Sequence, residues 1–156
     1  MLAGYCNEKN RNIAHLFYLM AASKNNDCES HYRMGNYYKE ESEKEKSILY
    51  FEKCFSNIVK YSSLSPSEKL CVSNSINNLM DFYEDKKDFC KIIFMLRKAS
   101  FYGHKSSTEF LGLFYYEVED YYEAKHFLQL CVNQISSKLR MYFSELLHNC
   151  LIQLNL

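Results

Sequence analysis

Tyrosine side chains are the residues of this chain best suited to contacting a partner molecule. There are 14 tyrosines and no tryptophan. Tyrosine offers a large contact area at low entropic cost and is enriched at interface hot spots. In the doublets at 37–38 and 115–116 one tyrosine, Tyr38 or Tyr115, belongs to the apolar face of an expected helix. Its neighbour points about 100° away. We therefore predict a groove for a protein partner, lined by Arg33, Asn36, Tyr37, Asn78 and Tyr116.

A second candidate surface combines basic and aromatic side chains. Between residues 86 and 105, basic residues alternate with Phe101, Tyr102 and His104. Basic groups that contact phosphates, together with rings that stack on bases, are typical of single-stranded RNA binding. Most of these residues are lysines, whereas the arginine guanidinium group is better suited to phosphate recognition. The predicted RNA contacts are Lys86, Lys87, Lys91, Arg97, Lys98 and Lys105.

Catalytic and metal-binding patterns are missing from the sequence. The five histidines are scattered, and no His-Glu-x-x-His or Gly-x-Ser-x-Gly pattern occurs. Cys28 and His31 have the spacing of two ligands on one helix face, but no second pair of matching spacing completes a zinc site. The four glycines form no phosphate-binding loop. We expect a protein that is not an enzyme and that binds no metal and no cofactor.

Composition points to a helical protein of the cytoplasm. Only four glycines and one proline are present, which is too few for the many turns of a β-sandwich or barrel. The net charge is zero, which argues against a highly basic nucleic-acid or membrane-surface protein. No signal peptide or membrane-spanning segment is visible. The seven cysteines are therefore expected to be reduced, buried small hydrophobic residues.

An internal repeat organises the chain. When Gly35 is aligned with Gly112 without gaps, Tyr38 falls on Tyr115 and Cys54 on Cys131. A degenerate middle copy places Tyr83 at the tyrosine position, and each copy has the length of a helical hairpin. We predict a single helical-repeat domain over 1–156, with hairpins at about 22–60, 66–98 and 99–133 and a C-terminal capping helix at about 137–154.

Polar residues mark where the helices start. Ser65-Pro66-Ser67-Glu68 combines a capping box with proline at the first helical position. Ser42 with Glu45, Ser106 with Glu109 and Asp120 with Glu123 have the same spacing. The mixed charges of residues 39–46 are interpreted as a solvated junction between two helices, and the alternative is a specific docking patch. The expected helices are about eight, near 10–24, 28–40, 43–60, 66–84, 86–101, 106–118, 121–133 and 137–154.

Two glycines are expected inside helices, where glycine costs about 1 kcal/mol relative to alanine. Close approach of the partner helix explains that cost, because a Cβ atom would not fit at Gly35 or Gly112. The small residues Ser47 and Ala124 lie at matching positions on the partner helices.

The residues of the third copy carry a family resemblance. Its pattern runs from Ala99 and Gly103 through Leu111-Gly112-x-x-Tyr115 to Asp120-Tyr121-x-x-Ala124-x-x-Phe127-Leu128. This resembles a Sel-one-like repeat, a relative of the tetratricopeptide repeat. The copy with Ala21-Ala22, Met34-Gly35-x-x-Tyr38 and Phe51 is similar, but has Ser47 where the family usually has alanine. The resemblance implies a short α-solenoid of antiparallel hairpins that acts as a scaffold in protein complexes.

Three functions are compatible with the sequence. The first is a non-enzymatic protein–protein interaction module or adaptor subunit of a larger assembly, whose inner helices bind a peptide or helix. The second is a regulatory factor of the dormancy type that is associated with a ribosome or another ribonucleoprotein. The third is a peptide-binding module similar to a secretion chaperone. None of the three requires contact with a membrane.

Overall fold

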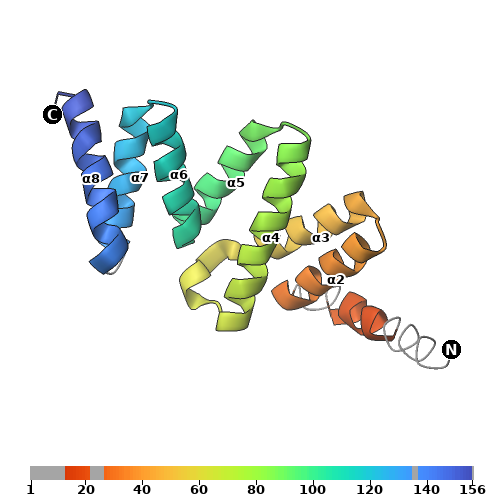
Figure 1. Cartoon of the computed structure of the whole chain (residues 1–156). Coiled ribbons are helices and arrows are strands. Elements are labelled where there is room, and N and C mark those ends of the chain that lie inside the picture. Colours follow the sequence, from red (N-terminus) through yellow and green to blue (C-terminus); the bar gives the residue numbers. More distant parts are fainter. Residues whose placement is uncertain (1–12, 22–26, 135–136, 156) are drawn as a thin grey trace. The chain divides into compact units, whose positions relative to one another are not determined.

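The computed structural model describes residues 13–21, 27–134 and 137–155. All regular secondary structure in these ranges is helical (Figure 1). Residues 13–21 form a helical segment, and the later elements are α2 (Cys28–Glu40), α3 (Lys44–Ser56), the 3₁₀-helix η1 (Ile58–Ser63), α4 (Pro66–Asp85), α5 (Phe89–Phe101), α6 (Lys105–Glu117), α7 (Tyr121–Gln134) and α8 (Ser137–Gln153).

The all-α class, with eight α-helices in the described ranges, is confirmed. The expected long connection near residues 56–65 contains η1. Ala22 and Cys6, and the ends of the helix expected at 10–24, lie outside the described residues. No helix in the described ranges combines the length and apolar character needed to cross a bilayer.

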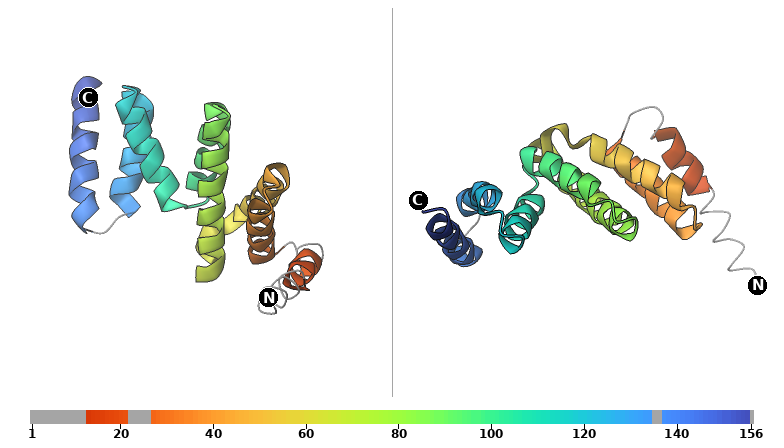
Figure 2. Two further views of the ribbon diagram at one scale, coloured as in Figure 1. Left: turned by 45° about the vertical axis from the view of Figure 1, so that its right-hand side comes forward. Right: turned by 90° about the horizontal axis from the view of Figure 1, so that it is seen from above.

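The chain divides into two compact units, which meet between Asp88 and Phe89. In the first unit α2 packs on α3, and both contact α4. In the second, α5 packs on α6, α6 on α7 and α7 on α8. Figure 2 shows α2 beside α3 and α7 beside α8. The boundary falls inside the range 66–98 assigned to the middle hairpin, so the division into three hairpins stays a prediction.

Close helix packing occurs at both glycines, although the neighbouring residues differ from the expected ones. A Cβ atom on Gly35 would lie 2.5 Å from Cε1 of Phe51, and one on Gly112 would lie 3.1 Å from Cδ2 of Leu128. Phe51 and Leu128 are equivalent in the repeat alignment, one helical turn beyond Ser47 and Ala124. Ser47 has a different role, because its hydroxyl donates a 2.9 Å hydrogen bond to the Gly35 carbonyl.

Two of the four predicted helix starts are confirmed. Ser65 and Glu68 form the complete capping box of α4, and the Asp120 carboxylate accepts a hydrogen bond from Glu123 N. The other two predictions are wrong. Ser42 lies in a left-handed turn with φ 60°, and α3 starts without a side-chain cap. His104, not Ser106, caps α6 by accepting a hydrogen bond from Ser107 N.

The helices before four of the turns end in the same backbone geometry. The carbonyl groups of Tyr38, Tyr83, Ala99 and Tyr115 each accept a hydrogen bond from the amide five residues later. The residue just before that amide has positive φ in every case: Ser42, Lys87, Gly103 and Glu119. The three tyrosines aligned by the internal repeat therefore occupy the same position relative to the end of a helix.

The two glycines are expected to respond differently to alanine. Gly35→Ala forces the buried Phe51 ring to move, which outweighs the gain in helix propensity, so the free energy of unfolding falls by about 2 kcal/mol. At Gly112→Ala the flexible end of Leu128 gives way, and the change stays below about 1 kcal/mol. Urea unfolding followed by circular dichroism measures both. Equal stability of Gly35→Ala and the wild type would contradict the packing argument.

His104 is expected to make stability depend on pH. Burial lowers the pKa of His104 below its ordinary value of 6.5, and the neutral ring is the form that accepts the bond from Ser107 N. The unfolded chain therefore takes up a proton first as the pH falls below about 6.5, and its uptake destabilises the fold.

The free energy of unfolding should consequently decrease between pH 7 and pH 5. His104→Asn keeps a capping side chain without a titrating group, so its decrease should be smaller than that of the wild type. Identical pH profiles for the two proteins would refute a contribution from His104.

Candidate functional site

A groove in the first unit combines an apolar floor with charged edges. It has a volume of about 330 Å³ and lies between the α2–α3 turn, α3 and α4. Ser47 and Phe51 are buried in its floor, and Ile48 and Phe82 are half-buried there. We call it the α2–α4 groove; its lining residues are Lys39, Ser42, Lys44, Ser47, Ile48, Phe51, Asn78, Asp81, Phe82 and Asp85.

The charges around the α2–α4 groove are separated by sign. Lys39 and Lys44 stand at the α2–α3 side, whereas Asp81 and Asp85 stand on α4. All four side chains are exposed. Within the described residues, neither lysine forms an ion pair with either aspartate. A bound segment would therefore meet the positive charge of Lys44 at the α2–α3 side and the negative charges of Asp81 and Asp85 on α4, while the Lys39 ammonium is held at Asn78.

Local contacts hold the edges of the groove in place. Lys39 Nζ donates a 2.5 Å hydrogen bond to Asn78 Oδ1, which ties the end of α2 to the middle of α4. Asn78 Nδ2 in turn donates to the Asn74 carbonyl at 2.8 Å. The Lys86 ammonium lies 4.4 Å from the centre of the Phe82 ring. Asn78, a predicted groove residue, is thus found at a groove edge.

Three further predicted groove residues gather at a second hollow. Arg33, Asn36 and Tyr37 line a space of about 260 Å³ between α2 and the helical segment 13–21. His15 from that segment stacks on Tyr37, with ring centres 3.9 Å apart. Arg33 forms an exposed ion pair with Glu29 at 3.4 Å. The three residues therefore share one surface, although it is separate from the α2–α4 groove.

His15 is a half-buried titratable group at this second hollow. Its Nδ1 atom is buried and has no hydrogen-bond partner within the described residues. Burial lowers the pKa of His15, and the nearby Glu41 partly opposes that shift. A neutral imidazole with an unpaired nitrogen can accept a hydrogen bond from a bound donor group.

Tyr116 lies in the second unit, whereas the other four residues of the predicted groove lie in the first. Its hydroxyl accepts a 3.4 Å hydrogen bond from Asn149 Nδ2 of α8. Its ring meets Tyr121 edge-on, with centres 5.9 Å apart. Tyr116 thus helps to seat α6 against its neighbours within the second unit.

The predicted RNA contacts are divided between the two units. Lys86 and Lys87 follow α4 in the first unit, whereas Lys91, Arg97 and Lys98 are on α5 in the second. Lys105 opens α6, and its ammonium group donates to the Gln134 carbonyl at 3.2 Å. Of the six predicted RNA contacts, only Lys91, Arg97 and Lys98 therefore share a helix.

Arg97 is engaged within its own unit. Its Nη2 atom lies 2.7 Å from Glu123 Oε2, and both Nε and Nη2 donate to the Tyr115 hydroxyl at 3.2 and 3.0 Å. The guanidinium carbon lies 5.4 and 5.5 Å from the ring centres of Tyr115 and Phe127. These contacts raise the pKa of Arg97, chiefly through Tyr115 and then Glu123. Arg97 therefore ties α5 to α6 and α7.

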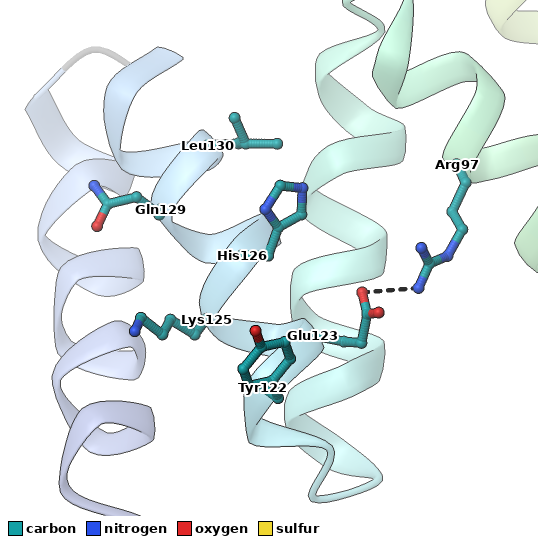
Figure 3. Close-up of a pocket in the computed structure, with 7 residues that line it drawn as sticks. All are labelled: Arg97, Tyr122, Glu123, Lys125, His126, Gln129 and Leu130. Carbon is teal, nitrogen blue, oxygen red and sulfur yellow. Dashed lines mark ion pairs between the residues drawn. The ribbon is translucent and has the colours of Figure 1, made fainter. Parts of the chain in front are cut away.

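Figure 3 shows Arg97 reaching toward Glu123 at the side of a hollow on α7. The hollow has a volume of about 560 Å³, and Lys125, His126 and Gln129 project from α7 around it (Figure 3). His126 meets Phe127 edge-on at 5.0 Å. Within the described residues it has no hydrogen bond to Glu123 that would orient it as a general base.

Helix α5 carries two exposed phenylalanines, of which Phe101 belongs to the predicted basic and aromatic surface and Phe94 was not predicted. Phe94 is 72% exposed and Phe101 is 83% exposed. They stand seven residues apart, and a lysine precedes each by three residues, Lys91 and Lys98. In a helix these spacings place all four on one side. The repeated Lys-x-x-Phe pattern was the signal available in the sequence.

No group of three or more histidine, cysteine or carboxylate residues in the described part of the chain is arranged to hold a metal ion. Comparison of the chain with protein-family models, with curated proteins and with solved structures gives no match.

Proposed function

We propose that this protein is a non-enzymatic protein–protein interaction module that binds a short peptide segment in the α2–α4 groove. The observation that carries the proposal is the apolar floor of Ile48, Phe51 and Phe82 between edges of opposite charge. Apolar burial supplies affinity, while charges at the rim set orientation and partner choice.

The size of the groove limits what it holds. Its volume of about 330 Å³ is at the low end of ligand pockets, which range from about 300 to 1,000 Å³. It therefore takes one or two apolar side chains of a peptide rather than a large ligand. The preferred peptide has an apolar anchor, a basic residue toward Asp81 and Asp85, and an acidic residue toward Lys39 and Lys44.

The resemblance to Sel-one-like repeats supports the same proposal. In an α-solenoid of this kind, α2, α4 and α6 are the first helices of successive hairpins. The α2–α4 groove is lined by the end of α2, by α3 and by α4, so in such an array it lies where the first two hairpins meet. We propose the solenoid arrangement and the scaffold role together.

Charge reversal at one edge tests the groove. Peptides selected from a random displayed library should carry both charges around an apolar residue when the wild type is the bait. With Asp81→Lys/Asp85→Lys both edges are positive, so selected peptides should become acidic. Binding of the original peptides, measured by fluorescence anisotropy, should weaken by about tenfold or more, because it loses complementary charges and gains repulsion.

The matched control is Glu45→Lys/Glu84→Lys, which changes the net charge equally at exposed residues outside the groove. It should select the same peptides as the wild type. If both double variants shift the selection alike, net charge rather than the groove determines binding. Failure of the wild type to select any peptide would reject the proposed function.

The exposed face of α5 favours a second candidate, contact with single-stranded RNA. Helix α5 contains Lys91 and Lys98 and no acidic residue, while its third basic residue, Arg97, is paired with Glu123. Phe94 and Phe101 present their rings to solvent beside the two lysines. Aromatic rings next to basic groups bind single strands by stacking on bases and contacting phosphates.

Binding of a labelled uridine oligonucleotide of about 15 nucleotides tests this candidate by fluorescence anisotropy. Phe94→Ala/Phe101→Ala should weaken binding by tenfold or more, because stacking contributes about 1–3 kcal/mol per base. Binding should also fall steeply as salt rises. Tyr122→Ala removes an exposed aromatic ring from α7 and serves as the control. No binding at low salt would eliminate the RNA candidate and leave the peptide groove unaffected.

A further inference from the structure

Two buried thiols of the first unit are in direct contact. Cys28 is the first residue of α2, and Cys54 lies in the last turn of α3. Their Sγ atoms are 2.8 Å apart, and both side chains are buried. Sulfur atoms in a disulfide are about 2.0 Å apart, so a small local movement brings the two atoms to bonding distance.

We propose that Cys28 and Cys54 are a redox modification site, at which a low-molecular-weight disulfide of the glutathione class converts the two thiols into an intramolecular disulfide. One thiolate attacks the reagent disulfide, forms a mixed disulfide and releases one reagent thiol. The second thiolate then attacks the protein sulfur of that mixed disulfide and expels the second reagent thiol. The protein loses two protons and two electrons, and the two reagent thiols that are released carry both.

The contact singles out this pair among the described cysteines. Cys71 of α4 is also buried and lies near enough to Cys28 for the two thiols to interact electrostatically, but within the described residues no hydrogen bond joins its sulfur to another thiol. Cys90 is exposed. Cys131 and Cys150 are buried in the second unit. Cys28 additionally points its Sγ at the Cys54 carbonyl, 3.7 Å away.

The surroundings of the pair keep the thiols protonated and the reaction slow. The hydrogen bond with Cys54, followed by burial, raises the pKa of Cys28. The reactive thiolate is therefore scarce, and a reagent reaches it only when the first turn of α2 opens. The reduced form persists in a reducing environment, and the rate of oxidation should rise with pH.

The link would join two helices that border the α2–α4 groove. The disulfide would close a loop between residues 28 and 54, which lowers the conformational entropy of the unfolded chain. Neither the link nor its formation depends on the proposed peptide binding. A failed oxidation experiment therefore leaves the groove proposal standing, and a failed peptide selection leaves the disulfide proposal standing.

The test uses the full chain incubated with oxidised glutathione, followed by blocking of free thiols, intact-mass measurement and trypsin digestion without reduction. Trypsin separates Cys28 and Cys54 into peptides 25–33 and 54–60. The expected product lacks two hydrogen atoms and gives a single species in which these two peptides are linked. Dithiothreitol should reverse it, and the melting temperature of the oxidised protein should be higher by about 10 °C.

Variants separate this pair from other cysteines. Cys28→Ala and Cys54→Ala should each abolish the linked species, whereas Cys90→Ala should retain it. A link through Cys6 or Cys71, or a glutathione adduct without an internal link, would overturn the proposal. If an alanine variant fails to fold, the peptide map of the oxidised wild type alone decides the outcome.

Discussion

The close approach of paired helices at a glycine is the constraint on which the two helical units depend. In the first unit the Phe51 ring occupies the space where Gly35 would otherwise carry a Cβ atom, and in the second Leu128 packs against Gly112 less tightly, with its Cδ2 atom 3.1 Å from where a Cβ atom would lie. Both side chains are almost completely buried. A large apolar residue facing a glycine sets how near two helices lie and in which register. The remaining contacts are then arranged around that spacing.

The candidate sites follow from this packing. With α3 held tightly against α2, Phe51 also forms part of the floor of the α2–α4 groove. Ser47, one turn earlier, is bound to the Gly35 carbonyl and leaves the edge of the groove to charged residues. The same pairing brings Cys28 at one end of α2 to Cys54 near the end of α3. One helix pair therefore supplies both a binding surface and a buried thiol contact.

Much of the fold was predictable because local chemistry specifies it. Ser65, Pro66 and Glu68 define a helix start by side-chain bonds to nearby backbone amides, and those bonds need no tertiary context. The Ser106–Glu109 pattern failed because Gly103, with φ +90°, ends the turn and leaves His104 at the cap. Ser106 and Glu109 have the spacing of a capping box, but both lie inside α6. Sequence spacing alone does not show at which residue the backbone reverses.

The candidate site was less predictable than the fold. Arg33, Asn36 and Tyr37 come together because they share a face of α2, which helical periodicity shows. Lys39 and Lys44 belong to the run of mixed charges at residues 39–46, and the sequence does not show that Asp81 and Asp85 of a distant helix lie across a groove from it. Tyr116 was assigned to the groove by analogy with Tyr37, but its hydroxyl is committed to Asn149.

The turns between helices carry a consequence for how this sequence tolerates change. Ser42, Lys87 and Glu119 adopt a left-handed conformation that costs a non-glycine residue about 1–2 kcal/mol, whereas Gly103 adopts it freely. Three of the four turns with this geometry are therefore strained. Replacing Ser42, Lys87 or Glu119 by glycine should relieve part of that strain and raise the free energy of unfolding. Such a glycine substitution would offset a destabilising change of similar size elsewhere in the chain.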